Sequence, residues 1–146
     1  REHIVGANSS LDPLLKKYKF KSQVPSWKFE LLAAILVGDI KKSGYGHDLL
    51  YHEVKSSMGG SFDYHYYRKS WKTKLEQEKE IDHIFISYSE NFKVKIYRLE
   101  SEQLQETLDS WERDIAGRVS DVPNIDYRQA LSLGFVKANG ELIMQC

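Results

Sequence analysis

The chain has 146 residues, of which 41% are hydrophobic and 29% are charged, a composition typical of one ordinary globular domain. Its 21 basic and 21 acidic residues give a net charge of zero, which argues against nonspecific nucleic-acid binding through overall charge. The longest apolar run, Leu31–Val37, is too short to span a membrane, and the single Cys146 forms no internal disulfide. We therefore expect a cytoplasmic protein without membrane contact.

Residues 1–25 are polar and contain two prolines, so we expect an irregular lead there. The chain begins at Arg1 rather than Met, which suggests a processed chain or a domain cut from a longer protein. A helix is predicted to begin after Ser26, and its run Leu31–Leu36 is apolar all round, which predicts a largely buried helix. The globular domain is expected to span residues 26–146.

The most informative stretch is Asp48 followed by Glu53-Val54-Lys55 in a short, β-prone run. Successive side chains of a strand point to opposite faces, so Glu53 and Lys55 should project side by side while Val54 faces the other way. The segment Ser43–Gly46 contains two glycines, which lets the chain turn and bring the Asp48 carboxylate alongside that of Glu53.

Two carboxylates in a small space repel each other, and a bound cation relieves that repulsion. Mg²⁺ suits such a site, because it prefers oxygen ligands and is often held by one or two carboxylates, with waters and phosphate oxygens in its other positions. The Lys55 ammonium can then orient or help deprotonate an attacking water, or neutralise charge on the phosphorane oxygens. The stretch therefore predicts a Mg²⁺ (or Mn²⁺) site for cutting phosphodiesters.

Asp48 followed by Glu53-Val54-Lys55 resembles the PD-(D/E)xK signature of restriction-endonuclease-like nucleases. The resemblance implies an α/β (α+β) fold, with a mixed β-sheet flanked by helices in the order αβββαβ. It implies a metal-dependent endodeoxyribonuclease of restriction type that acts on double-stranded DNA in a prokaryotic host. It further implies that Asp48, Glu53 and the Val54 carbonyl bind the metal and that Lys55 is catalytic. The sequence has no proline before Asp48 and a short gap to Glu53, so Asp39 is the alternative acidic ligand.

Further candidates lie on both sides of the triplet. In some members of the family a glutamate of the preceding helix approaches the metal, which makes Glu30 a candidate; otherwise Glu30 is a first-turn acid that favours the helix dipole. His65 either contacts the scissile phosphate or is a partly buried histidine. Basic residues near the triplet face either DNA or water, and those we take as candidate DNA contacts are Lys41, Lys42, Arg68, Lys69 and Lys72.

Five elements are predicted after the triplet. Tyr67, Trp71 and Leu75 recur at helical spacing and predict a helix over 62–80 with these three side chains in the core. The others are a buried strand at 81–89, a half-exposed strand at 92–99 that completes a hairpin with it, a helix at 101–118 with the apolar stripe Leu104, Leu108, Trp111 and Ile115, and a second hairpin at 135–144 with Asn139-Gly140 as a type I′ turn.

Two other functions fit the same residues. A nuclease-like domain that holds nucleic acid or a protein partner without cutting is consistent with the zero net charge. Alternatively, Glu53 and Lys55 form a surface ion pair that contributes at most about 1 kcal/mol to stability. A homodimer would be needed to cut both strands together, and the sequence does not show one.

Overall fold

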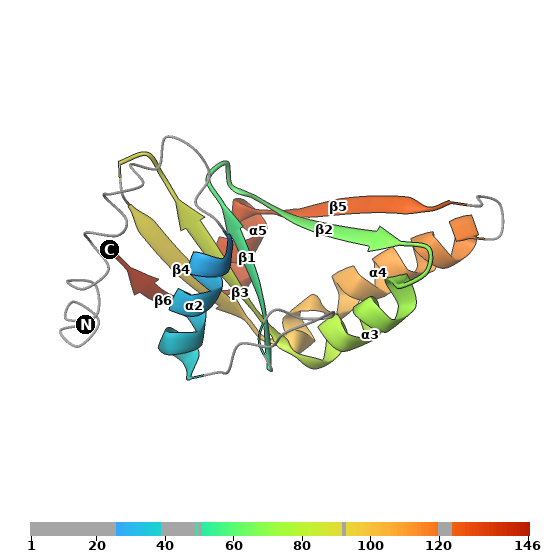
Figure 1. The fold of residues 1–146 in the computed structure, drawn as a ribbon, viewed down its shortest axis with the longest axis horizontal. Coiled ribbons are helices and arrows are strands. Elements are labelled where there is room, and N and C mark those ends of the chain that lie inside the picture. The colour runs from blue at the N-terminus through green and yellow to red at the C-terminus, as the bar shows by residue number, and fades with distance from the viewer. Residues whose placement is uncertain (1–25, 39–48, 50, 92, 120–123) are drawn as a thin grey trace.

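A computed structural model describes residues 26–38, 49, 51–91, 93–119 and 124–146 (Figure 1). The helices and strands in chain order are α2 (Ser26–Val37), β1 (His52–Ser57), β2 (Ser61–Tyr67), α3 (Trp71–Glu80), β3 (Asp82–Tyr88), β4 (Val94–Leu99), α4 (Ser101–Val119), β5 (Asp126–Ser132), α5 (Leu133–Asn139) and β6 (Glu141–Gln145). The predicted helices that begin at 26 and at 101 are confirmed, as is the hairpin of β3 and β4.

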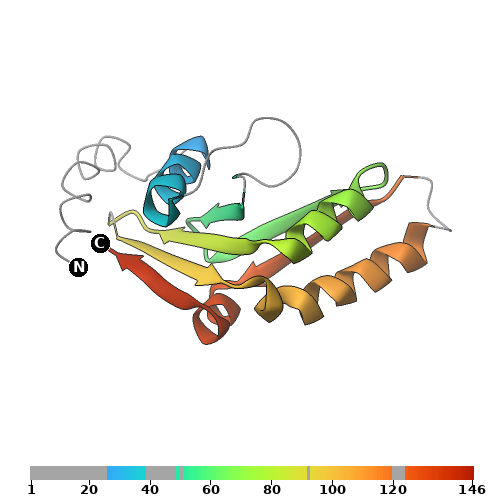
Figure 2. The ribbon, with the colours of Figure 1, turned by 90° about the horizontal axis from the view of Figure 1, so that it is seen from below.

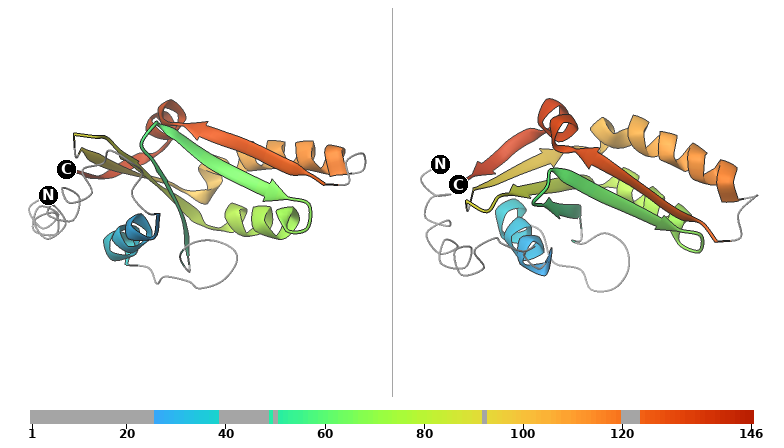
Figure 3. Two further views of the ribbon diagram at one scale, coloured as in Figure 1. Left: turned by 45° about the horizontal axis from the view of Figure 1, so that its top comes forward. Right: turned by 90° about the horizontal axis from the view of Figure 1, so that it is seen from above.

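Four strands form a mixed sheet in the order β1-β3-β4-β6. β1 is parallel to β3, whereas β4 is antiparallel to both of its neighbours. β2 and β5 form a separate antiparallel ribbon, which extends beyond the sheet beside α3 and α4 (Figure 3). The predicted mixed sheet flanked by helices is therefore confirmed.

The order of the elements differs from the one that the resemblance implies. The described elements run α2, β1, β2, α3, β3, with one strand fewer than αβββαβ, and residues 39–48 lie outside the described part. The strand of Glu53 pairs in parallel with β3 and not, among the described residues, with an antiparallel neighbour. A restriction-endonuclease-like core therefore stays a prediction.

The sheet separates two apolar cores, and different helices cover its two faces (Figure 2). On one face, Phe29, Leu32 and Ala33 of α2 pack against Val54 of β1 and Ile84 of β3. On the other face, a second core joins the sheet to α5 and to the β2–β5 ribbon, and α4 continues this core along the ribbon. The predicted stripe of α4 is buried there with aromatic side chains of the ribbon: Leu104, Leu108, Trp111, Ile115, Phe62, Tyr64, Tyr66 and Tyr127.

The helix α2 is less buried than its composition predicts. Leu32, Ala33 and Ala34 lie in the core, but Leu31 and Ile35 are 49% and 64% exposed. A helix that packs against one face of a sheet can bury only one stripe of side chains, because its residues project in all directions around the axis.

The predicted helix over 62–80 is wrong in its first half. Residues 61–67 form β2, a turn follows at 68–70, and only Trp71–Glu80 is helical. Phe62, Tyr64 and Tyr66 are buried while the residues between them face outward, which is the period of a half-buried strand. Tyr67 is 55% exposed and does not belong to the core stripe.

The predicted hairpin at 135–144 is also wrong. Leu133–Asn139 is the helix α5, and β6 pairs with β4 instead of with a local partner. Gly140 has a φ of −100°, so it is not part of a type I′ turn. A Cβ at this position would lie 2.7 Å from the Val136 carbonyl oxygen, so the glycine permits the close approach of β6 to the end of α5.

Within the described part of the chain, no helix has both the length and the apolar character needed to cross a membrane.

Candidate functional site

The strand β1 sends Glu53 and Lys55 to the same face, as its period predicts. Val54 lies in the core on the α2 side, and Glu53 and Lys55 point to the opposite side. Glu53 is only 3% exposed, and its Oε2 lies 3.8 Å from Nζ of Lys55. The side chains of Lys55 and Glu53 are 17% and 4% exposed, so this is a largely buried ion pair and not one on an open surface.

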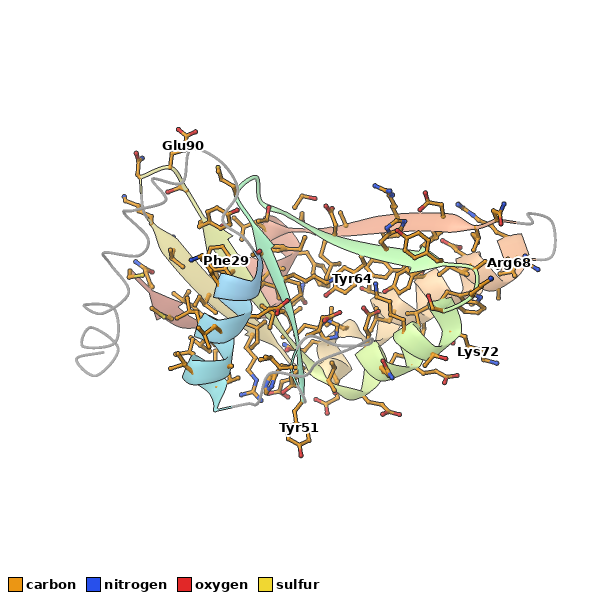
Figure 4. All side chains as sticks on the ribbon, viewed as in Figure 1. Phe29, Tyr51, Tyr64, Arg68, Lys72 and Glu90 are labelled. Atoms are coloured by element: carbon orange, nitrogen blue, oxygen red, sulfur yellow. The ribbon has the colours of Figure 1, made fainter. Side chains whose placement is uncertain are left out.

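Aromatic side chains of β2 form the wall that faces this pair. The Lys55 ammonium lies 4.4 Å from the ring centroid of Tyr64, a cation–π distance that confines it above the ring. Tyr64 and Tyr66 share the inner face of β2, so the Tyr66 ring lies on the same face as the Tyr64 ring that contacts Lys55. Tyr51, which precedes β1, points outward and is exposed (Figure 4).

A buried histidine lies beside Glu53 on the neighbouring strand. His83 is the register partner of Glu53, and its Nε2 lies 2.8 Å from the main-chain oxygen of Glu78. A carbonyl only accepts, so Nε2 carries the proton, and Nδ1 accepts the hydroxyl hydrogen of Tyr64 at 2.7 Å. Burial lowers the pKa of His83 to about 4, and the Lys55 ammonium adds to that decrease. His83 is therefore neutral, and it holds Tyr64 beneath Lys55.

The buried His83 should make the protein sensitive to acid. The pKa is 6.5 for an ordinary histidine and about 4 here, so between these pH values the unfolded chain binds the proton and the folded chain does not. The free energy of unfolding should therefore fall by about 3 kcal/mol as the pH is lowered through this window. Denaturant unfolding above and within the window checks this, with His83→Gln expected to lose less stability on acidification. An equal loss in both proteins would contradict it.

The helix α3 contributes a second buried carboxylate. The Tyr66 hydroxyl donates to Oε1 of Glu78 at 2.6 Å, and Glu78 is 1% exposed. Burial raises the pKa of Tyr66 well above its usual value, and the charges of Glu78 and of Glu53 add to the rise. Tyr66 therefore stays protonated, with carboxylates from α3 and β1 in its surroundings.

The described residues supply only some of the ligands predicted for a divalent cation. No group of three or more His, Cys, Asp or Glu side chains is arranged around one point in the described part of the chain. Of the predicted acidic ligands, Glu53 is described, whereas Asp48 and its alternative Asp39 lie outside the described residues. Leu49 is buried in the α2 core, and its amide donates to the His52 carbonyl at 2.9 Å, so the residue after Asp48 is fixed at the start of β1.

The other predicted site residues are spread over the molecule. Glu30 is half-buried on α2, the helix that covers the opposite face of the sheet. His65 projects from the outer face of β2, away from Tyr64 and Tyr66, and its ring bonds to Asp126. His65 therefore does not share a face with Glu53, as a contact with the scissile phosphate would require.

The basic candidates divide into two sets. Arg68 and Lys69 lie in the turn after β2, and Lys72 lies in the first turn of α3; all three are exposed. Figure 4 shows Arg68 and Lys72 at this end of the molecule. Arg68 also donates to the Val119 carbonyl at 2.9 Å, which ties this end of the ribbon to α4. Lys41 and Lys42 lie outside the described residues.

Sequence reasoning missed Tyr64, Tyr66, Glu78 and His83. Two signals were present. The aromatic residues at 62, 64 and 66 alternate with other residues, which indicates a strand face. Glu78 lies three residues after Leu75 and seven after Trp71, a spacing that places a charged residue on the apolar stripe of α3. A carboxylate at a core position is a signal of function, because its burial is costly.

A scan against protein-family models found no match for this sequence, and a search of curated proteins found none either. Function has to be argued from the chemistry of the site.

Proposed function

We propose that the protein is a Mg²⁺-dependent endonuclease that hydrolyses phosphodiester bonds of double-stranded DNA. The observation that carries this proposal is the pairing of a nearly buried carboxylate, Glu53, with the Lys55 ammonium 3.8 Å away on one strand face. A carboxylate and an amine in this arrangement can hold a cation and direct a nucleophile at the same phosphate.

Each residue of the triplet has a role in this proposal. Glu53, the Val54 carbonyl and Asp48 would hold the cation, the ligand set that the PD-(D/E)xK resemblance implies. When bound, Mg²⁺ supplies Lewis acidity and orients the phosphate. Lys55 orients the attacking water or neutralises charge on the phosphorane oxygens. The Tyr64 ring limits the positions of the Lys55 ammonium, and the neutral His83 adds no charge that would compete with it.

The DNA would be held by basic residues outside the site. Arg68, Lys69 and Lys72 are exposed where β2 passes into α3, and their charges suit phosphate contacts. Such contacts position a duplex without reading its sequence. Cleavage of both strands in one encounter would need two copies of the chain, a homodimer on the DNA.

The wild-type protein tests this proposal directly. Because the recognised sequence is unidentified, the substrate is bacterial genomic DNA, which contains most short sites, together with a supercoiled plasmid. We expect nicking or fragmentation with Mg²⁺ or Mn²⁺ and none when EDTA removes the metal, because water is a poor nucleophile without it. A protein that is folded and saturated with Mg²⁺ but leaves both substrates intact would overturn the proposal.

One observation favours a binding module as the second candidate. Glu53 is almost fully buried and Lys55 lies over Tyr64, so the pair can also act as an internal anchor between β1 and β2. Calorimetry separates the two functions. The nuclease requires Mg²⁺ or Mn²⁺ binding that Asp48→Asn weakens, whereas a binding module should hold DNA equally well with and without the metal.

A further inference from the structure

The helix α3 buries a carboxylate, Glu78, on a face whose other inward side chains are apolar. Leu75 and Glu78 are both buried, one turn apart, and Trp71 is half-buried one turn earlier. A leucine at 78 would continue the apolar stripe at no electrostatic cost. A buried carboxylate is expensive unless its oxygens have partners, so its presence needs a reason.

Only one of the two Glu78 oxygens has a partner. Oε1 accepts the Tyr66 hydroxyl at 2.6 Å, whereas Oε2 has no hydrogen-bond partner, and no other buried side-chain oxygen or nitrogen of the described residues is in that state. An unsatisfied buried acceptor is costly, and it is more costly when it is charged. Lys74, four residues before Glu78 on α3, donates to the His65 carbonyl at 2.6 Å.

Two connections tie Glu78 to the surroundings of Glu53. The main-chain oxygen of Glu78 accepts from His83, the register partner of Glu53 on the next strand. Its side chain holds the hydroxyl of Tyr66, which lies on the inner face of β2. Beside burial, the charges of Glu78 and of Glu53 raise the pKa of Tyr66, so carboxylates from α3 and from β1 both act on its hydroxyl.

We propose that Glu78 is a further carboxylate of the divalent-cation site at Glu53, with Oε2 as its open acceptor. This inference rests on the proposed function and adds a ligand that the PD-(D/E)xK resemblance does not supply. Buried carboxylates that lie near one another repel, a bound cation relieves that repulsion, and Mg²⁺ prefers oxygen ligands of this kind. Tyr66 is then a positioning residue, because its bond to Oε1 fixes the direction of Oε2.

Mn²⁺ binding to the full chain, measured by calorimetry, tests the role of Glu78. Glu78→Gln keeps the volume and an oxygen for the Tyr66 hydroxyl but removes the charge, and we expect the Kd for Mn²⁺ to rise about tenfold or more. The control is Glu76→Gln, an exposed position on the same helix, which should bind Mn²⁺ like the wild type. Tyr66→Phe leaves the charge but frees the carboxylate, and should weaken binding by a smaller factor.

Thermal unfolding without metal distinguishes a metal ligand from a purely structural Glu78. The two roles predict opposite changes in the unfolding temperature of Glu78→Gln. We expect metal-free Glu78→Gln to unfold at the same or a higher temperature than the wild type, because an amide is cheaper to bury than a carboxylate with an open oxygen. Mn²⁺ should then raise the unfolding temperature of the wild type more than that of the variant. A lower metal-free unfolding temperature together with unchanged Mn²⁺ affinity would overturn the inference.

The inference and the proposed function fail in different ways. If Glu53→Gln abolishes Mn²⁺ binding and cleavage while Glu78→Gln and Tyr66→Phe bind Mn²⁺ like the wild type, the cation site excludes Glu78 and the nuclease function stands. If the wild type cuts no DNA but its Mn²⁺ binding is lost in Glu78→Gln, the cation site stands and the nuclease function fails. A wild type that binds no Mn²⁺ overturns the inference.

Discussion

Glu53→Gln is expected to abolish DNA cleavage while the fold survives. Glutamine has the shape of glutamate and keeps one oxygen, but it removes the negative charge that attracts the cation. A bound metal stabilises the transition state by several kcal/mol, and each 1.4 kcal/mol is about a tenfold change in rate, so the loss should reach about 10³-fold or more. Cleavage of genomic DNA under single-turnover conditions measures it, and calorimetry should show Mn²⁺ binding lost in parallel.

The control for this substitution is Glu106→Gln, on an exposed position of α4, which removes the same charge outside the proposed metal site. It should cleave at the wild-type rate. Circular dichroism checks that Glu53→Gln is folded, because the change leaves Lys55 without its partner at 3.8 Å. A folded Glu53→Gln that cuts DNA within a few-fold of the wild-type rate would overturn the proposed mechanism.

Lys55→Met is expected to slow the chemical step by about 10²-fold while Mn²⁺ still binds, because the ammonium acts on the water or on the developing charge and not on the metal. Methionine keeps an unbranched stem that can lie on the Tyr64 ring. Lys55→Arg separates the two roles of the lysine. Arginine keeps the charge but cannot accept a proton, so a rate near that of the wild type would assign Lys55 to charge neutralisation, and a rate near that of Lys55→Met to proton transfer.

Lys137→Met, on the exposed face of α5, is the matched control and should leave both rate and binding unchanged. Single-turnover rates at saturating Mg²⁺, with DNA binding measured in parallel, separate a slower chemical step from weaker binding. A Lys55→Met protein that loses its affinity for Mn²⁺ but not its rate at saturating metal would contradict the role assigned to Lys55.

The elements that local patterns predicted well are those whose partners are near in sequence or whose apolar stripe is long. The hairpin of β3 and β4 connects neighbouring strands, and α4 carries four apolar residues at helical spacing. The strand β2 was mistaken for helix because its partner, β5, begins at Asp126, far along the chain. Such a distant pairing leaves no trace in the local pattern beyond the alternation of Phe62, Tyr64 and Tyr66.

The candidate site also has one part that the sequence predicts and one part that it does not. The sequence by itself determined that Glu53 and Lys55 share a face, because the period of a strand fixes this for any residues two apart. Only the tertiary structure decided that this face is buried, that Tyr64 lies under Lys55, and that His83 and Glu78 join it from β3 and α3. Burial and proximity depend on how the β2–β5 ribbon and α3 close over the sheet, and these contacts join segments whose local patterns carry no information about one another.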